Sequence, residues 1–362
     1  MDFQQPRKVS KWRRIKKWIN GHRLFMIITI SVLGIGATSV IAFAMLYPEK
    51  APQVSVFSTP KPKVAPKYYS PLTGVQVADE ATTKQAVTAI MIENSPDARP
   101  QSGIKDAGVI YEAVAEGGIT RFLTLHQENK PQLIGPVRSL RMYYVDWLAP
   151  YNASVAHVGG SKYALDEVRN GNYRDIDQFF NSPYYWRATD RYAPHNVYTS
   201  FAKLDALNSA KGYTTSTFTG FKRTDGKPAE KPDATQLNIK ISGPLYNTTY
   251  TYDPGTNTYA RNLAGVPHKD REKGQLTPSV VVAMFVDMKK VMEDGWREDI
   301  TTTGSGRAVV FQNGVANEVT WKKSSRSAQL QFTNADGSEL ALVRGQTWIS
   351  AVPNSGGAAT WQ

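Results

Sequence analysis

The sequence predicts an α+β protein with an N-terminal transmembrane helix, a mixed α/β first domain and a mainly antiparallel β second domain. Three observations support this fold class. Residues 24–46 carry no charged side chain, and about 20 apolar residues suffice to cross a bilayer as a helix. Between 68 and 221, short apolar runs alternate with helical patterns. After residue 235, β-branched or alternating segments are separated by turn residues, which is typical of antiparallel sheets.

The basic residues are concentrated in the N-terminal arm. The segment before residue 24 holds eight Lys or Arg residues and only Asp2 as an acid, so it supplies +7 of the net charge of +12. The positive-inside rule therefore places the N-terminus in the cytoplasm and everything after Tyr47 outside the cell membrane. Because the remaining chain is only weakly basic, nucleic-acid binding by its folded part is not expected.

A cleaved signal peptide is the alternative to a membrane anchor. Ala42-Phe43-Ala44 matches the A-x-A cleavage pattern. The apolar run is longer than a signal-peptide core of about 7–15 residues, and no polar segment precedes the motif. These features favour an uncleaved, single-pass signal anchor.

Residue composition excludes several kinds of site. The chain has no cysteine, which excludes disulfides, Cys-ligated zinc, iron–sulfur clusters, thiol nucleophiles and a lipid-modified cysteine. The five histidines show no metal-ligand spacing, and no clustered acidic loop suggests calcium. We therefore expect neither a metal nor a cofactor.

Composition shifts define the domain boundaries. Prolines at 48, 52, 60, 62 and 66 indicate an extended spacer, and the polar stretch 222–235 contains Gly and two prolines. The expected parts are a basic arm (1–23), a transmembrane helix (24–46), a linker (47–67), a first domain (68–221), a second linker (222–235), a second domain (236–352) and a tail (353–362).

In the first domain, apolar runs predict strands over 86–92, 107–113, 119–126 and 154–158. Three helices are expected, one opening at Gly135-Pro136, one from Ser161 to Arg169 and one from Thr199 or Ser200 to Lys211. The aromatic segment 172–200 has no clear periodicity and reads as a functional or packed surface loop.

In the second domain, alternating or β-branched segments predict eight strands, separated by turns such as Asp253-Pro254-Gly255 and Asn313-Gly314. They cover residues 236–241, 248–252, 257–261, 279–287, 306–312, 318–323, 328–333 and 340–343.

Several ordered motifs resemble the YerB-like family, a two-domain family of bacterial cell-envelope proteins of unknown function. In the first domain the motifs are Ala98–Gly103, Tyr111-Glu112, Glu116–Phe122, Gly135–Ser139 and Ala193–Asn196. In the second they are Tyr252–Pro254, Pro267–Asp270, Gly304–Gly306, Thr320–Lys323 and Gly345–Ile349.

The resemblance covers nearly all of the chain from Tyr69 to Trp348 and implies an envelope location and two domains. It supplies no reaction and no catalytic residues. Members of the family are often lipoproteins anchored through a cysteine, and the absence of cysteine here fits a transmembrane anchor instead.

Five arginines of the first domain form the leading candidate site. A planar guanidinium binds carboxylate or phosphate through two parallel hydrogen bonds, and helix N-termini also favour anions. The candidate ligand-binding residues are Arg99, Arg121, Arg138, Arg141, Gly159, Gly160, Ser161, Arg191, His195 and Asn196. The alternative is that the arginines pair inside the fold with acids, namely Glu93, Glu112, Glu116 and Asp146.

Two histidines are weaker candidates for catalysis. His157 closes a predicted strand and His195 lies in the aromatic loop, so either could act as a general acid or base with Glu112 or Glu116. No nucleophile elbow or paired catalytic motif fixes a reaction, and a structural role for both histidines is the favoured interpretation.

The function that we expect is therefore binding in the cell envelope, of an anionic wall-derived ligand or a partner protein. An envelope hydrolase or transferase with a first-domain site is the competing class. A structural scaffold for cell-wall machinery is the third.

Overall fold

The computed structural model describes residues 18, 20–46, 66–290 and 297–362. It comprises two compact units, Met1–Ala65 and Pro66–Gln362. In the first unit, α2 (Arg23–Leu46) contains one stretch, Met26–Phe43, that is long and apolar enough to cross a membrane. The predicted arm and linker rest mainly on residues 1–17 and 47–65, which lie outside the described residues.

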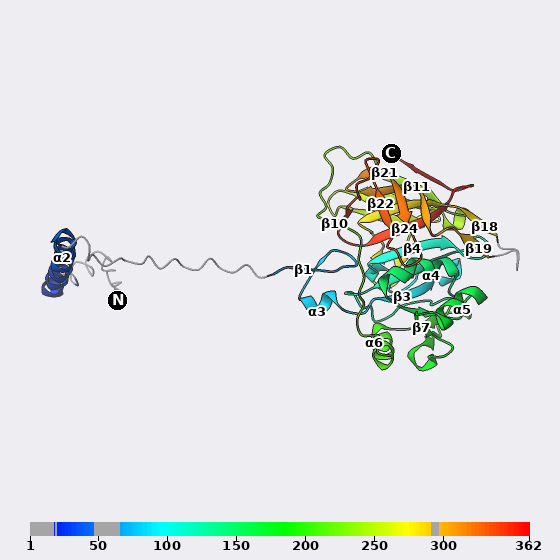
Figure 1. Cartoon of the computed structure of the whole chain (residues 1–362), viewed down its shortest axis with the longest axis horizontal. Helices are drawn as coiled ribbons and strands as arrows, with labels where there is room; N and C mark the ends of the chain where they lie inside the picture. The colour runs from blue at the N-terminus through cyan, green and yellow to red at the C-terminus, as the bar shows by residue number, and fades with distance from the viewer. Residues whose placement is uncertain (1–17, 19, 47–65, 291–296) are drawn as a thin grey trace, which may run out of the picture. The chain divides into compact units, whose positions relative to one another are not determined.

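The second unit is built on a mixed ten-stranded sheet (Figure 1). In spatial order its strands are β22 (Gln331–Thr333), β21 (Val315–Lys323), β20 (Gly304–Gln312), β17 (Val280–Val286), β24 (Thr347–Pro353), β4 (Val109–Val114), β5 (Thr120–His126), β3 (Thr88–Glu93), β6 (Ser154–His157) and β7 (Arg174–Asp177). The parallel pair β24–β4 joins strands of the predicted second domain to strands of the first, so the sheet runs through both.

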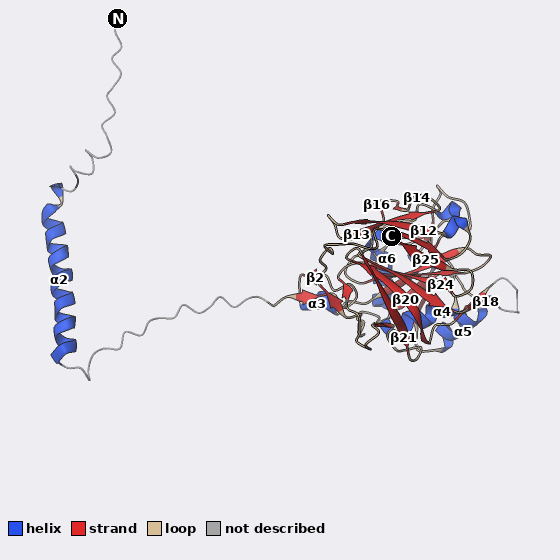
Figure 2. Ribbon diagram, turned by 90° about the horizontal axis from the view of Figure 1, so that it is seen from above, coloured by secondary structure: helices blue, strands red, loops and turns tan. Residues whose placement is uncertain are grey.

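A second, antiparallel sheet of five strands packs on the C-terminal half. Its order is β14 (Val266–Pro267), β13 (Thr258–Leu263), β12 (Thr248–Asp253), β11 (Gln236–Lys240) and β25 (Ala358–Trp361). In Figure 2, β20 and β21 of the large sheet cross the unit side by side, as their nine-residue antiparallel register requires.

The α-helices of residues 66–362 are short and lie in the N-terminal half of this unit. They are α3 (Glu80–Thr83), α4 (Met142–Leu148), α5 (Lys162–Asn170) and α6 (Phe201–Ala210), with 3-10 turns η2 (Pro96–Ala98), η3 (Ile104–Asp106), η4 (Ala149–Tyr151), η5 (Ser182–Tyr184) and η6 (Pro244–Tyr246).

Two-residue and three-residue strands pair at the periphery. The pairs are β1 (Tyr68–Tyr69) with β2 (Gln76–Val77), β8 (Trp186–Arg187) with β9 (Val197–Tyr198), β10 (Arg223–Thr224) with β23 (Leu342–Val343), β15 (Lys269–Asp270) with β16 (Gly274–Gln275), and β18 (Met288–Lys290) with β19 (Glu298–Ile300).

Both faces of the large sheet are buried, and alternate residues along a strand contribute to hydrophobic clusters on opposite faces. On β17, Val280, Val282 and Met284 face a cluster that includes α4 and α5, while Val281 and Ala283 face the five-stranded sheet. Helix α6 covers the second face where β3 to β6 lie. Residues 66–362 contain all four hydrophobic clusters, so this unit has the core it needs to fold without the first.

The predicted fold class is confirmed, and most predicted strands coincide with observed ones. The helix expected at Gly135-Pro136 is wrong, because α4 begins only at Met142. The N–H of Val137 donates to Val197, that of Arg138 to Met91 and that of Leu140 to Gly159. These donors are committed to other segments, so residues 135–140 form an extended connection beside β3.

The aromatic segment 172–200 is more regular than its sequence suggests. It contains β7, β8, β9 and the turn η5, all too short to produce a detectable period. The loop between β8 and β9 reaches the surface pocket described below.

A fully buried ion pair links the two sheets. Arg261 on β13 donates from Nη2 to Glu112 on β4 at 2.8 Å, and neither side chain is exposed. The same carboxylate accepts the indole N–H of Trp348 at 2.9 Å and the hydroxyl of Thr120 at 3.1 Å. The guanidinium also stacks 3.9 Å from the Trp348 ring centroid. These donors offset part of the free-energy cost of burying a carboxylate.

The polar network continues from Arg261 toward the surface. The Nε–H of Arg261 donates to His268 at 3.0 Å, and the other ring nitrogen of His268 lies 3.0 Å from the side-chain oxygen of Gln101. Gln101 donates to Asn94, which in turn accepts the Nε–H of Arg99. Arg99 is therefore the surface end of a buried chain that begins in the second sheet.

Replacing Glu112 with Ala is expected to destabilise residues 66–362 by about 3–5 kcal/mol, because Arg261 would remain buried without its counter-charge. Urea unfolding followed by tryptophan fluorescence measures this. The control is Glu318→Ala, which breaks a half-exposed pair with Arg307 and should cost less than about 1 kcal/mol. Equal losses in the two variants would contradict the role given to the buried pair.

Stability should also fall in mild acid. Burial against Phe201 lowers the pKa of His126 from 6.5 to about 3, so the folded state keeps this ring neutral. The unfolded state binds a proton as the pH falls below about 6.5. The stabilisation is therefore complete above that pH and is lost toward pH 3, at up to about 1.4 kcal/mol per pH unit.

Comparing urea midpoints at pH 7 and pH 5 for the wild type and His126→Leu isolates this contribution. The variant should lose less stability between the two pH values. Burial also lowers the pKa of His268, which remains in both proteins and cancels in the comparison. An identical loss in both proteins would count against the assignment.

Candidate anion-binding pocket

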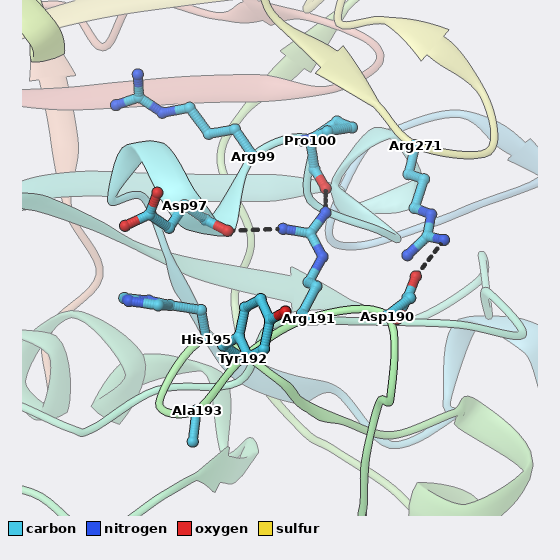
Figure 3. A pocket seen from close by; sticks show the side chains of 9 residues that line it. All are labelled: Asp97, Arg99, Pro100, Asp190, Arg191, Tyr192, Ala193, His195 and Arg271. Atoms are coloured by element: carbon cyan, nitrogen blue, oxygen red, sulfur yellow. Dashed lines mark hydrogen bonds and ion pairs between the residues drawn. The ribbon is translucent and has the colours of Figure 1, made fainter.

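An open surface pocket of about 730 Å³ brings together residues from both halves of the sequence (Figure 3). It is lined by Asp97, Arg99, Pro100, Asp190, Arg191, Tyr192, Ala193, His195 and Arg271. Three of these, Arg99, Arg191 and His195, belong to the predicted ligand-binding set. The lining carries three guanidinium groups against two carboxylates, so its side chains are net positive with His195 neutral.

Three loops build the pocket. The first follows β3 through η2 to Pro100, the second connects β8 to β9, and the third follows β15. Asn196 fixes the second loop, because its amide donates to the carbonyls of Ala188 and Arg191 while its oxygen accepts from Arg187. Asn196 thus holds a loop of the pocket in place without lining the pocket itself.

Arg191 occupies the middle of the pocket and is held by neutral partners. Its Nη1 donates to the backbone carbonyl of Asp97 at 3.0 Å, and its Nη2 donates to that of Pro100 (Figure 3). Among the described residues no carboxylate lies within ion-pair distance of Arg191. Backbone carbonyls orient a guanidinium without cancelling its charge, and several of its five N–H donors remain for a ligand.

Arg99 is held in the same manner. It donates to the side chain and carbonyl of Asn94, at 3.1 and 2.8 Å, and to the carbonyl of Leu245 at 2.9 Å. Its guanidinium stacks 5.3 Å from the Tyr246 ring centroid. Partial burial lowers the pKa of Arg99 below its ordinary value, since desolvation disfavours the charged form. A bound anion would oppose that effect.

Arg271, the third guanidinium, is already paired. Its Nη2 lies 2.6 Å from the carboxylate of Asp190, at the edge of the pocket. Both side chains are substantially exposed, so the pair is exchangeable with an incoming anion at modest cost.

The remaining candidate arginines pair with acids, as the alternative prediction stated. Arg121 contacts Glu116 at 2.9 Å, Arg141 contacts the same carboxylate, and Arg138 lies 3.3 Å from Glu93. The other two acids named in that alternative pair elsewhere, Glu112 with Arg261 and Asp146 with Arg326.

The glycine turn before α5 does not join the pocket. The N–H of Gly159 donates to Asp177, and that of Ser161 donates to the carbonyl of Leu140. Gly160 bridges Leu140 as well. Ser161 and Arg141 instead line a different depression of about 630 Å³, together with residues of β18 and β19. The structure thus divides the predicted site into two places.

The two candidate histidines have different surroundings. His157 is fully buried, and its nitrogens contact Asp175 at 2.9 Å and the carbonyl of Gly159 at 2.8 Å. His195 is partly exposed in the pocket and contacts Glu93. Among the described residues no group of three or more His, Asp or Glu side chains could hold a metal ion.

Sequence reasoning missed Glu93, Asp190, Tyr192 and Arg271 as site residues. Arg271 directly follows the family motif Pro267–Asp270, which could have drawn attention to it. Nothing in the sequence, however, indicates that this motif contacts a loop of the first domain. Glu93 was predicted only as a possible structural partner of the arginines.

Comparison with known proteins finds a similar putative lipoprotein of Bacillus subtilis. The chain is 32% identical over 302 residues to "Putative lipoprotein YerB" of Bacillus subtilis strain 168, covering 81% of this chain and 88% of that protein. The crystal structure of the B. subtilis YerB protein matches with a TM-score of 0.73 at 29% identity, over 81% of this chain and all of that one.

Two family models match the chain in order. Residues 72–214 match the N-terminal domain of a protein family of unknown function, DUF3048, and residues 237–349 match its C-terminal domain. The pocket draws Arg99 and Arg191 from the first match and Arg271 from the second. The chain therefore belongs to the DUF3048 family of proteins of unknown function, to which it is related along both of the family's domains.

Proposed function

We propose that this protein is anchored in the cell membrane by α2 and binds an anionic ligand of the cell envelope in the Arg99–Arg191–Arg271 pocket. The proposal rests on how the Arg191 side chain is held. It is a guanidinium fixed in an open pocket by two backbone carbonyls, with no carboxylate in ion-pair contact among the described residues.

The contrast with neighbouring arginines supports a ligand site. Arg121 and Arg138, which pack inside the fold, each have a glutamate beside them. Arg99 and Arg191 are instead ordered by carbonyl groups that leave their charge available. Ordering a guanidinium in advance lowers the entropic cost of binding a phosphate or carboxylate through paired hydrogen bonds.

The pocket rim favours a sugar-bearing anion. Tyr192 lies beside Arg191 on the same loop and is 91% exposed, so its ring is free to stack on a flat apolar face. A glycan fragment that carries phosphate or carboxylate groups, as anionic wall polymers do, combines both chemistries. A partner protein would use the same charges, and the binding experiment below separates the two occupants.

The membrane arrangement follows from charge. The +7 arm precedes α2, and anionic head groups and the positive-inside rule both favour a cytoplasmic N-terminus. Residues 66–362 would then face the outside, where wall polymers are found.

Replacing Arg191 with Gln should weaken binding of poly(glycerol phosphate) or polyglucuronate to residues 66–362 at least tenfold, because the central charge and its donors are lost. Isothermal titration calorimetry at two salt concentrations measures this. Arg307→Gln removes the same charge from an exposed pair on β20 and serves as the matched control.

Several results would count against the proposed ligand. Equal binding by wild type and Arg191→Gln would exclude the pocket. Binding to neither polymer, together with capture of an envelope protein whose binding is lost in Arg191→Gln, would replace the glycan with a protein partner.

The orientation can be tested because the chain has no cysteine. In intact cells, Ala335→Cys in an exposed turn should react with a membrane-impermeant maleimide, while Ser10→Cys in the arm should react only after lysis. The reverse pattern would place the folded unit in the cytoplasm.

A further inference from the structure

We propose that the pocket is also a hydrolytic site, in which His195 acts as the general base for attack of water on a phosphodiester and Glu93 positions it. The inference rests on the proposed anion binding. It goes beyond that function by assigning a reaction to the same pocket.

The buried side chain of Glu93 contacts the partly exposed side chain of His195. Oε2 of Glu93 lies 3.0 Å from Nδ1 of His195, and the two side chains are 4% and 21% exposed. Glu93 is the last residue of β3, and its other oxygen lies 3.3 Å from Nε of Arg138. The carboxylate is therefore anchored on a central strand between a guanidinium and an imidazole.

This contact selects the tautomer of His195. An unprotonated Nδ1 would direct a lone pair at a carboxylate 3.0 Å away, so the proton resides on Nδ1 and the basic lone pair on Nε2. The Nδ1–H is not well aligned with Oε2, and catalytic pairs commonly align only when a substrate binds. In other hydrolases a carboxylate hydrogen-bonded to Nδ1 orients a histidine base, and Glu93 is placed to form that bond once the pair aligns.

Ser95 is not the nucleophile. Its hydroxyl lies 3.2 Å from Nδ1 of His195, the same nitrogen that faces Glu93. With that nitrogen protonated, Ser95 has no base to accept its proton. It can only accept a hydrogen bond and help to hold the ring.

Nε2 of His195 is the ring nitrogen that would accept the proton. His195 is one of the residues that line the pocket, with its ring pointing away from Arg191 on the side where Asp97 lies (Figure 3), and no hydrogen bond to Nε2 is made by any residue that the structure describes. Arg191, Arg99 and Asp97 are the charged groups that share this part of the pocket.

The lining determines the class of substrate. Its guanidinium groups suit a reacting centre that is already anionic and gains charge in the transition state, which describes a phosphodiester better than a neutral ester. The described lining side chains include no Ser, Thr, Cys or Lys, and the proposal therefore takes water as the nucleophile.

The reaction balances without any further reactant. Nε2 of His195 takes one proton from water, and the water oxygen forms a bond to phosphorus. The P–O bond to one alcohol breaks, and its electron pair stays on the departing oxygen, which takes a proton from solvent at the open pocket. The products are a phosphomonoester and an alcohol, and His195 returns its proton to solvent.

The test uses the full-length protein in detergent micelles with EDTA present, and two probes, bis(p-nitrophenyl) phosphate and poly(glycerol phosphate). The wild type should release nitrophenolate and phosphomonoester ends, respectively. His195→Gln should reduce both rates at least 100-fold while retaining affinity for inorganic phosphate within a few-fold. His22→Gln, which changes a histidine in the other unit, should leave the rates unchanged.

Glu93 is tested as a positioning residue through the split between kcat and KM. Without the carboxylate the ring is no longer held for proton transfer, so Glu93→Gln should lower kcat about tenfold while KM changes by less than about twofold. Glu93→Asp, which keeps the charge, should retain more activity than Glu93→Gln.

The outcomes separate the two proposals. If the wild type binds inorganic phosphate or poly(glycerol phosphate) but hydrolyses neither probe between pH 5 and 9, the reaction is wrong and the binding function stands. If His195→Gln is as active as the wild type, His195 is not the base. If the wild type binds no anion, both proposals fail.

Discussion

The buried pair of Arg261 and Glu112 is the interaction on which the rest of the structure depends. It joins a strand of the five-stranded sheet to a central strand of the ten-stranded sheet, in a place where neither charge meets solvent. Such a pair is stable only if nearly every donor and acceptor is used, and here Trp348, Thr120, Tyr250 and His268 complete the set. The relative position of the two sheets is thereby fixed by hydrogen-bond geometry as well as by apolar packing.

The same network gives the surface pocket its rigidity. From Arg261 it passes through His268, Gln101 and Asn94 to Arg99, so a guanidinium at the surface is ordered by contacts that begin in the second sheet. The end of β3 has a second role, because Glu93 anchors Arg138 and His195. A pocket supported by strand ends and a buried network is better suited to exact placement of a ligand than one built on loops alone.

This arrangement gives a physical reason for the two DUF3048 domains to occur together. Strands from both matched regions pair in one sheet, and arginines from both line one pocket. Neither region alone contains the buried pair, the complete sheet or the full lining. The chemistry of the pocket is therefore a property of the assembled unit, and its residues are spread from Asp97 to Arg271 along the chain.

The sequence by itself determined the elements whose signal is local. The uncharged run of α2, the apolar runs of β3, β4 and β5, and the alternating strands after residue 235 all follow from side-chain periodicity. It also indicated arginines, His195 and Asn196 as candidate ligand-binding residues. It failed at Gly135-Pro136, where helix-start residues form an extended connection because their N–H groups bond to distant segments. The tertiary structure decided which arginines meet a glutamate and which meet a carbonyl, because several of those partners lie far apart in sequence, as Arg261 lies from Glu112 and Arg191 from Asp97. For Arg121, Arg138 and Arg191, that difference between a paired charge and an available one is what distinguishes a packing arginine from a candidate ligand-binding one.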